Sequence, residues 1–308
     1  MTLKAGVIGA GVFGGHHARK YQADGRVALI GIYDLDPERT AVLAEDLGVR
    51  AFDKLEELLD AVDIITIASP PATHAASGVA ALDAGKHVFV EKPIATSLME
   101  AEAMIALANM HSRVLACGHQ ERLVFEAMGL FMAPEKPLLI ESTREGPWTG
   151  RSADVSVTLD LMVHDFDLAA TLLEAEPSRI EAVGKAHHGP SADKLDARLY
   201  FAEAEASFTS SRIADARKRT MRIVYPSGEV SVDFLARTFE NTTKFKLDAN
   251  FADTPPGRDP LGQNVSRFID AVLGKAGRPG VTGEEAKRAL SLALAADRAA
   301  GFPSLSHT

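Results

Sequence analysis

The feature that most constrains this chain is a glycine-rich turn directly after its first apolar segment. The segment Leu3–Ile8 is followed by Gly9, Gly11 and Gly14, in the spacing Gly-x-Gly-x-x-Gly. The first glycine permits a tight turn, the second allows a pyrophosphate to approach the backbone, and the third lets the following helix pack closely on the strand. The start of such a helix presents backbone N–H groups and a positive dipole end to phosphates. We therefore expect a dinucleotide to bind at Gly9, Gly11, Val12, Phe13 and Gly14.

A carboxylate at the end of the next apolar segment makes this interpretation more specific. The segment Val27–Tyr33 ends in Asp34, at a distance from the glycine turn that suits a ribose-binding carboxylate. A carboxylate there accepts hydrogen bonds from the ribose hydroxyls and repels a 2′-phosphate, and Asp36 adds a second negative charge. The sequence therefore favours NAD over NADP. The structural alternative is a glycine turn beside a solvated aspartate.

The first part of the chain, 1–121, alternates between strand-like and helix-like patterns. Apolar strands separated by helices indicate a parallel sheet buried on both faces, and right-handed crossovers then give a doubly wound α/β domain of the Rossmann type. The expected strands are Leu3–Ile8, Val27–Tyr33, Val62–Ala68, His87–Val90 and Val114–Ala116. The expected helices are Pro37–Leu47, Leu55–Leu59, Ala72–Ala84 and Ser97–Met110.

The second part, 122–308, has strands that follow one another directly. Strands without helices between them indicate an antiparallel sheet, so we expect a separate α+β domain for substrate binding and oligomerisation. The expected strands are Leu138–Ser142, Ile180–Lys185, Leu195–Ala202, Ala204–Ile213, Thr220–Tyr225 and Glu229–Phe234. The expected helices are Phe125–Met132, Val157–Glu174, Leu261–Leu273 and Glu284–Ala300, the last of which could pack back on the first domain. The proline-rich segment Ala252–Pro260 is expected to be an exposed connection.

The composition excludes several classes of protein. A hydrophobic content of 46% and a charged content of 24% argue against a disordered chain and against a multi-span membrane protein, so no membrane partner is expected. A net charge of −9 without a basic stripe argues against nucleic acid as a partner. Cys117 is the single cysteine, which precludes an intrachain disulfide and suits a reducing cytoplasm. The pairs His16-His17 and His187-His188 lack the partners of a metal site, so no metal is expected.

Polar residues follow two further strands of the predicted parallel sheet. Ser69, Pro70 and His74 come after the third expected strand, and Glu91 and Lys92 come after the fourth. Ligands bind outside the carboxyl ends of the strands in a doubly wound sheet, so we expect all five residues to lie near the cofactor. Lys92 would then lie near the reactive end of the nicotinamide. Taken alone, His74 is also typical of a helix face, and Lys92 of a solvated surface.

A pair of residues in the second part has the chemistry of alcohol oxidation. Asp160 and His164 stand one turn apart on the expected helix Val157–Glu174, with Cβ atoms about 5–6 Å apart. In alcohol oxidation, a base must take the hydroxyl proton while the hydride leaves the carbon atom. Histidine suits the role of the base because it titrates near neutral pH, and a carboxylate can orient the histidine. An ordinary Asp–His pair on a helix surface is the alternative. Asp165 and Asp167 are expected to be exposed, although Asp167 could orient His164.

In their order and spacing, these motifs resemble the Gfo/Idh/MocA family of sugar oxidoreductases over essentially the whole chain. The resemblance rests on the glycine turn, Asp34, Ser69-Pro70-Pro71 with His74, Glu91-Lys92-Pro93, and Asp160 with His164. It implies an N-terminal Rossmann domain and a C-terminal domain with an open-faced antiparallel sheet. That open face often serves as an interface in the family, which implies a homodimer or homotetramer. The implied substrate is a small sugar or nucleotide sugar.

The resemblance also implies roles for individual residues. Lys92 is expected to contact both the substrate hydroxyl and the cofactor, with a cis peptide bond before Pro93. His164 is expected to be the general acid and base, with Asp160 beside it on the substrate. Three more residues are candidates for weaker roles: Gln120 as a cofactor contact, and Arg122 and Trp148 as substrate contacts.

The segment 159–169 narrows the resemblance. Met162 stands where the family usually has a glycine, and the local sequence resembles a branch that acts on nucleotide-linked amino sugars, such as UDP-N-acetylglucosamine 3-dehydrogenases. We therefore expect an NAD-dependent dehydrogenase that acts on a CH–OH group. One alternative is a dehydrogenase or reductase of free sugars, inositols or diols. The alternative of another class is a protein that binds NAD(P) without turnover, as a redox sensor or scaffold.

Overall fold

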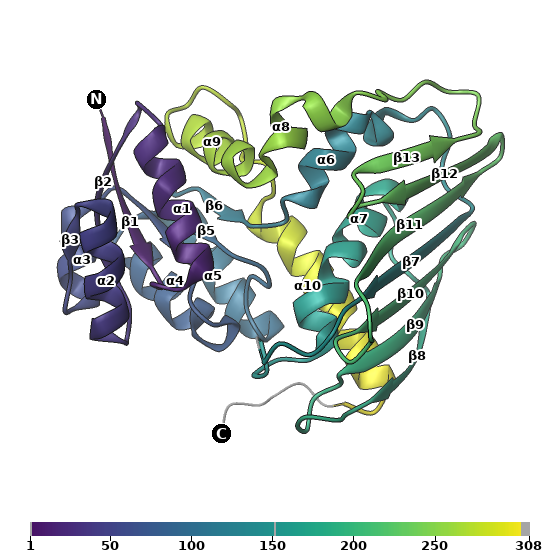
Figure 1. Cartoon of the computed structure of the whole chain (residues 1–308), viewed down its shortest axis with the longest axis horizontal. Coiled ribbons are helices and arrows are strands. Elements are labelled where there is room, and N and C mark those ends of the chain that lie inside the picture. Colours follow the sequence, from purple (N-terminus) through teal and green to yellow (C-terminus); the bar gives the residue numbers. More distant parts are fainter. Residues whose placement is uncertain (1, 151, 303–308) are drawn as a thin grey trace. The chain divides into compact units, whose positions relative to one another are not determined.

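The computed structural model describes residues 2–150 and 152–302, which form two compact units (Figure 1). Unit 1 comprises Met1–Gln120 and Leu261–Lys287, and unit 2 comprises Glu121–Pro260 and Arg288–Thr308. A late segment of the chain thus belongs to the first unit. The domain limits 1–121 and 122–308 stay predictions.

Unit 1 contains a six-stranded sheet in the order β3-β2-β1-β4-β5-β6. All neighbouring strands are parallel, and the order reverses between β1 and β4, as in a doubly wound sheet. The strands are β1 (Leu3–Ile8), β2 (Val27–Tyr33), β3 (Arg50–Ala51), β4 (Ile64–Ile67), β5 (His87–Val90) and β6 (Leu115–Cys117). The predicted Rossmann-type sheet is confirmed. The pattern did not predict β3, which has only two residues, both exposed.

The helices of unit 1 begin where capping residues stand in the sequence. Asp36 caps α2 through its carboxylate, and Pro37 occupies the first turn. Ser97 and Glu100 form a capping box at α5. The helices are α1 (Val12–Ala23), α2 (Pro37–Leu47), α3 (Leu55–Ala61), the 3₁₀ turn η1 (Pro71–Thr73), α4 (His74–Asp83), α5 (Leu98–Met110) and α9 (Pro260–Val272). Phe268 of α9 packs edge-on against Phe89 of β5, which adds this late helix to the core of unit 1.

Unit 2 contains a seven-stranded sheet in the order β13-β12-β11-β7-β10-β9-β8. The strands are β7 (Leu139–Glu145), β8 (Arg179–Lys185), β9 (Lys194–Tyr200), β10 (Glu205–Ser211), β11 (Lys218–Tyr225), β12 (Gly228–Asp233) and β13 (Thr238–Asn241). All neighbours are antiparallel except β7 and β10, which are parallel. The predicted α+β domain with an antiparallel sheet is confirmed, with one parallel pair where β7 lies between two strands that come later in the chain.

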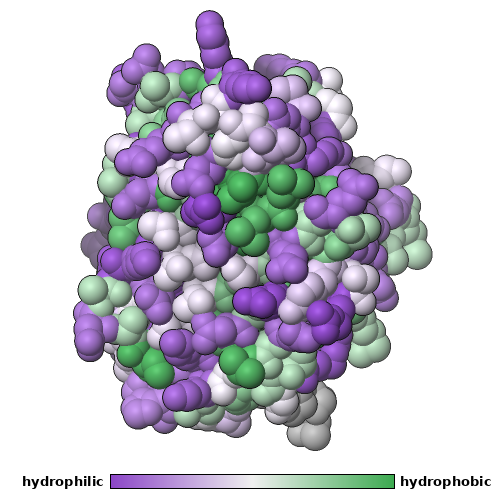
Figure 2. Space-filling view, turned by 90° about the vertical axis from the view of Figure 1, so that its right-hand side faces the viewer, coloured by the Kyte–Doolittle hydropathy of each residue, from purple (hydrophilic) through white to green (hydrophobic). Residues whose placement is uncertain are grey.

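Helices cover one face of this sheet. Alternate side chains of β9, β10 and β11 are buried, and Phe166 of α7 (Val163–Leu173) packs edge-on against Phe208 of β10. Figure 2 shows the molecule from the other side of this sheet, where apolar side chains gather among polar ones. The remaining helical segments are α6 (Glu121–Met128), η2 (Leu130–Met132), the π-helical turn η3 (Thr158–Met162), η4 (Phe251–Asp253), α8 (Pro255–Arg258) and α10 (Gly283–Ala299).

Two expectations for this part of the chain are corrected. The expected helix Val157–Glu174 begins as the π-helical turn η3 and becomes α-helical only at Val163. The segment Ala252–Pro260 is not a simple exposed connection, because it includes α8 and a buried glycine, Gly257. A Cβ atom at Gly257 would lie 1.8 Å from the carbonyl oxygen of Phe251, so only glycine fits this tight turn. Within the described residues, no helix is long and apolar enough to cross a membrane.

Candidate active site

The three glycines after β1 differ in what surrounds them. Gly9 has φ +106°, and a Cβ atom there would lie 2.7 Å from the backbone of Ala68. A Cβ atom at Gly14 would lie 1.8 Å from the carbonyl oxygen of Gly9. A Cβ atom at Gly11, in contrast, would meet no protein atom within 4 Å. Gly9 and Gly14 are thus required by the fold itself, whereas the absence of a side chain at Gly11 keeps an open approach to the backbone, which fits a pyrophosphate.

The start of α1 is open to an anion. Its N-cap residue is Gly11, no side chain caps the helix, and the first turn contains no acidic residue. Val12 is 69% exposed. The positive end of the helix dipole therefore faces outward beside the glycine turn, as phosphate binding requires.

Asp34 is fixed by two backbone groups. Its Oδ2 accepts a hydrogen bond from the N–H of Ala10 at 2.6 Å, and its Oδ1 accepts one from the N–H of Asp36 at 2.9 Å. The carboxylate is thus attached to the glycine turn and remains half-buried at the end of β2. Asp36 caps α2 and pairs with Arg39 at 3.1 Å. Its negative charge is therefore partly neutralised, and Asp34 is the main charge that would face a ribose.

His74 holds two neighbouring loops together. Its Nδ1 lies 2.7 Å from the carbonyl oxygen of Pro93, and its Nε2 lies 2.9 Å from that of Ser69. The side chain is 1% exposed. Burial lowers the pKa of His74, against the two carbonyl oxygens, which favour its protonated form. This histidine lies behind the loop of Ser69 and Pro70 and ties it to the segment after β5.

Glu91, Lys92 and Pro93 follow β5 at the carboxyl edge of the sheet. The peptide bond between Lys92 and Pro93 is cis, as the resemblance implied. Glu91 is 7% exposed, and its Oε1 lies 2.7 Å from Nε2 of His17. The sequence did not reveal this partner, because α1 and β5 are far apart in the chain. Gln120 lies half-buried three residues after β6.

In unit 2, the segment 155–170 exposes a narrow face. All its residues are buried except Asp160, Leu161 and His164, which are half-buried. The two predicted catalytic residues thus share the accessible side of η3 and α7. Met162 is fully buried, so the residue that replaces the usual family glycine points into the core and away from that face. π-Helical turns inside α-helices are frequent at functional sites.

A carboxylate of α10 anchors the start of this segment. Asp297 accepts hydrogen bonds from Ser156 Oγ at 2.6 Å and from Thr158 Oγ1 at 2.5 Å. All three residues are buried. Burial raises the pKa of Asp297, and the two hydroxyl groups oppose this rise. The hydrogen bonds fix the π-helical turn that carries Asp160.

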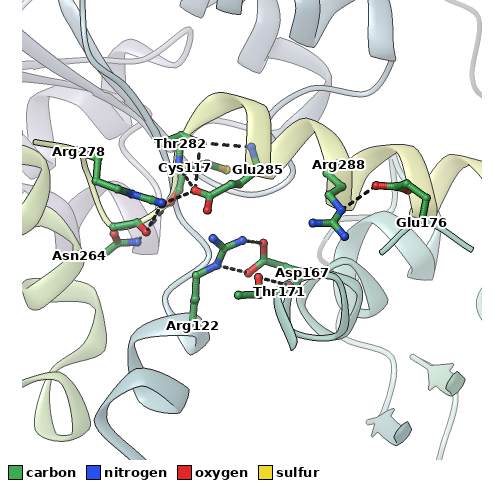
Figure 3. A network of polar contacts seen from close by, with 11 residues as sticks. Cys117, Arg122, Asp167, Thr171, Glu176, Asn264, Arg278, Thr282, Glu285 and Arg288 are labelled. Atoms are coloured by element: carbon green, nitrogen blue, oxygen red, sulfur yellow. Dashed lines mark hydrogen bonds and ion pairs between the residues drawn. The ribbon is translucent and has the colours of Figure 1, made fainter. Parts of the chain in front are cut away.

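Two buried arginines hold the carboxylates that flank His164. Arg144 of β7 donates to Asp165 at 2.8 and 3.0 Å and to Glu121 at 2.6 and 2.8 Å. Arg122 of α6 pairs with Asp167 through two hydrogen bonds (Figure 3). Both aspartates are 1% exposed, so the expectation that they lie on the helix surface is wrong.

The error has a physical cause. Charged side chains on a helix are normally exposed to solvent. They can be buried only where residues of opposite charge pair with them, and here those residues come from other elements of the fold. The partner Arg144 is an inward-facing arginine near the end of an alternating strand, and that charge in a core position was the available signal. Arg122, predicted to contact substrate, directs its guanidinium to Asp167.

Trp148 lies in the loop after β7 and stacks on His188. The ring centroids are 4.0 Å apart with an interplanar angle of 17°. Arg212 lies over the indole at 5.0 Å and pairs with buried Asp193 at 2.6 Å. Asp193 also accepts hydrogen bonds from the backbone N–H groups of His187 and His188. A buried ion pair thus organises a half-exposed aromatic surface in unit 2.

Family models match both parts of the chain. Residues 3–119 match an oxidoreductase family with an NAD-binding Rossmann fold, and residues 127–231 match a Gfo/Idh/MocA C-terminal domain. The chain belongs to the Gfo/Idh/MocA oxidoreductase family. The predictions of an oxidoreductase and of NAD as its cofactor are confirmed. The glycine turn, the open start of α1 and Asp34 are the parts of unit 1 that fit NAD.

Relatives of known activity cover almost the whole chain. A UDP-N-acetylglucosamine 3-dehydrogenase of Acidithiobacillus ferrooxidans is 35% identical and covers 95% of each sequence. Its solved structure superposes with a TM-score of 0.89 over 98% of this chain and 99% of that one, at 33% identity. A myo-inositol 2-dehydrogenase of Thermotoga maritima is 26% identical over 96% of each sequence. The WlbA dehydrogenase of Bordetella pertussis, solved with NADH and UDP-GlcNAcA, shares the fold at 19% identity, with a TM-score of 0.85 over 97% of this chain and 96% of that one.

Proposed function

We propose that this enzyme oxidises a ring hydroxyl of a nucleotide-linked amino sugar of the UDP-N-acetylglucosamine type. The observation that carries the proposal is the 35% identity, over 95% of each chain, to a UDP-N-acetylglucosamine 3-dehydrogenase. The accessible face of Asp160 and His164 supports it, since these two side chains suit the removal of a hydroxyl proton.

Three side chains handle the reacting hydroxyl in this proposal. NAD, when bound, accepts the hydride from the carbon that carries the hydroxyl. His164 takes the hydroxyl proton at Nε2, because its Nδ1 atom is buried. Asp160, on the same accessible face, orients the hydroxyl and stabilises the protonated imidazole. The ammonium group of Lys92 donates to the substrate oxygen and stabilises the negative charge that develops there as the carbonyl forms.

We further propose that Trp148 contacts the substrate outside the reacting ring. Trp148 is half-exposed and stacks on His188, and the buried Arg212–Asp193 pair supports the indole from beneath. A planar aromatic surface of this kind suits a heteroaromatic base. Removing the indole should therefore raise the KM for a UDP-sugar more than the KM for the free sugar.

A cofactor-reduction screen tests the substrate class. The purified enzyme is mixed with NAD and with UDP-N-acetylglucosamine, other UDP-sugars, free sugars or inositols, and NADH formation is followed. The proposal expects kcat/KM for UDP-N-acetylglucosamine to exceed that for free N-acetylglucosamine by at least about a hundredfold, or about 2.7 kcal/mol. Faster turnover of a free sugar or inositol would contradict it and favour the second candidate, a free-polyol dehydrogenase, for which the myo-inositol 2-dehydrogenase relative argues.

We also propose that the enzyme is a homodimer or homotetramer that uses the uncovered face of the seven-stranded sheet. Exposed apolar side chains on or beside this sheet, such as Val183 at 69% and Leu138 at 48%, support the proposal. Light scattering after size-exclusion chromatography tests it, and a monomer at micromolar concentration would contradict it. The reducing cytoplasm remains the proposed compartment, supported by the single buried thiol of Cys117.

A further inference from the structure

A buried contact between His17 of α1 and Glu91 at the end of β5 lies next along the chain to the proposed catalytic lysine. Neither residue has a part in the proton transfer described above. We propose that Glu91 is a positioning residue for Lys92 and that His17 holds Glu91 in place. The inference rests on the role of Lys92 in the proposed function.

The geometry joins three groups through one carboxylate. Oε1 of Glu91 lies 2.7 Å from Nε2 of His17, and Oε2 accepts a hydrogen bond from the backbone N–H of Lys92 at 3.3 Å. His17 is 0% exposed and Glu91 is 7% exposed. The carboxylate therefore links the phosphate-binding helix to the backbone of the lysine, out of contact with bulk water.

The surroundings of the carboxylate are fitted to it. A Cβ atom at Gly118 would lie 2.7 Å from Oε2 of Glu91, so a side chain at position 118 would displace the carboxylate from its present place. The backbone N–H of Glu91 donates to Ile67 of β4 at 2.9 Å. The ring of His17 packs on Phe89, with centroids 5.0 Å apart. Residues of the neighbouring strand β4 and of the segment after β6 thus contact Glu91 on both sides.

Stability alone does not account for such a pair. Burying a carboxylate is costly even when it has a hydrogen-bonded partner, and well-packed apolar residues often serve a fold equally well. A fold that needed only a filled core at this place would be as well served by an apolar pair. The Glu91 carboxylate supplies a defined negative charge next to Lys92, which an apolar side chain would not.

The charge on Glu91 is maintained by its neighbours. Burial acts to raise the pKa of Glu91, but His17, Lys92 and His74 outweigh it and hold the pKa below its ordinary value. These three groups, from α1, the residue next along the chain and α4, are the titratable groups that act on the carboxylate. The negative charge therefore stays next to the residue that donates to the substrate oxygen in the proposed function.

Variants of both partners test the inference in the intact enzyme. Glu91→Gln keeps the shape of the side chain and removes its charge. We expect kcat to fall about tenfold or more, the KM for NAD to stay within about threefold, and the alkaline limb of the pH–rate profile to move about one unit lower. His17→Phe should reproduce the fall in kcat, whereas His17→Gln, which keeps an N–H donor, should recover most of it.

Two reference variants separate the possible failures. Asp270→Asn removes a carboxylate that pairs with Arg26 at 2.6 Å, before the amino end of β2, and should leave the pH profile unchanged. Lys92→Ala tests the proposed function itself. If Lys92→Ala is inactive while Glu91→Gln retains normal kcat and an unshifted alkaline limb, the positioning role is wrong. If Lys92→Ala keeps full turnover, the catalytic role of Lys92 in the proposed function is wrong, whatever the result for Glu91→Gln. NAD binding and thermal unfolding of each variant show whether it is folded.

Discussion

The two units of this enzyme hold their candidate functional residues in different ways. In unit 1, backbone geometry forms the cofactor site: Gly9 and Gly14 allow the turn, and Gly11 leaves its approach open. In unit 2, buried charges hold the candidate residues: Arg144 and Asp297 fix the segment that carries Asp160 and His164. Residues close together in the sequence determine a site that is formed by the backbone. A site that is held by buried charges depends on partner residues far away in the chain.

The largest expected effect tests whether the two units contribute to one reaction. Lys92→Ala and His164→Ala should each lower kcat by about 10²–10⁴-fold, the usual scale for positioned acid–base groups. Steady-state kinetics on the true substrate measures this. NAD affinity, measured by fluorescence titration, should stay nearly constant in His164→Ala. Turnover within a few-fold of the wild type in either variant would mean that the corresponding unit contributes no catalytic group at that position.

The next effect concerns the buried charges of unit 2. Arg144→Met leaves Asp165 and Glu121 without their shared cation, so the free energy of unfolding should fall by about 3–5 kcal/mol. Urea denaturation measures this loss. Arg222→Met is the matched control, because Arg222 also pairs with two carboxylates on the same sheet, but at the surface, where little change is expected. Equal losses in the two variants would show that burial is not what makes Arg144 important.

A substitution at Gly11 tests whether the glycine turn of unit 1 binds the pyrophosphate of NAD. Gly11→Val should reduce NAD affinity by at least about a hundredfold, or about 2.7 kcal/mol, because the side chain occupies the approach of the pyrophosphate. The thermal midpoint should change little, since a Cβ atom there meets no protein atom within 4 Å. Gly14→Val is the contrasting variant and should impair folding itself, because its Cβ atom would overlap the carbonyl oxygen of Gly9. If Gly11→Val binds NAD as tightly as the wild type, the glycine turn is not part of the cofactor site.

A smaller effect is expected at the ribose carboxylate. The wild type should bind NAD at least about tenfold more tightly than NADP, about 1.4 kcal/mol, because Asp34 accepts from the ribose hydroxyls and repels a 2′-phosphate. Asp34→Ser should narrow this difference mainly by weakening NAD. Isothermal titration with both nucleotides gives the ratio. Equal or tighter binding of NADP by the wild type would contradict the assignment of Asp34.

The smallest expected effect is a pH dependence of stability from Glu91. Its folded pKa lies below the ordinary value of 4.5, so the carboxylate stabilises the folded state above pH 4.5. That contribution is lost as the pH falls below 4.5 and through the folded pKa. Glu91→Gln should therefore show a flatter decline of the unfolding free energy below pH 4.5 than the wild type. Parallel declines in the two proteins would show that Glu91 contributes nothing to this dependence.

The fold and the cofactor side could be predicted because their determinants are close together in the sequence. The glycine spacing, the carboxylate after Val27–Tyr33 and the strand–helix alternation all lie within short windows. The parallel pairing of β7 with β10 could not be predicted, because strand order depends on which edges remain available after folding. The burial of Asp165 and Asp167 was missed for the same reason, since their partners Arg144 and Arg122 come from other elements.

The most direct test of the account is the turnover of the double variant Lys92→Ala/His164→Ala, beside the two single variants. If both side chains act on the same hydroxyl, the double variant should lose less than the product of the single losses, because groups that act as a unit are not additive. The rate of NAD reduction at saturating substrate, with hydride transfer rate-limiting, supplies the comparison. If the loss of turnover in the double variant equals the product of the two single losses, Lys92 and His164 act independently. That result would contradict the claim that both side chains act on the same hydroxyl.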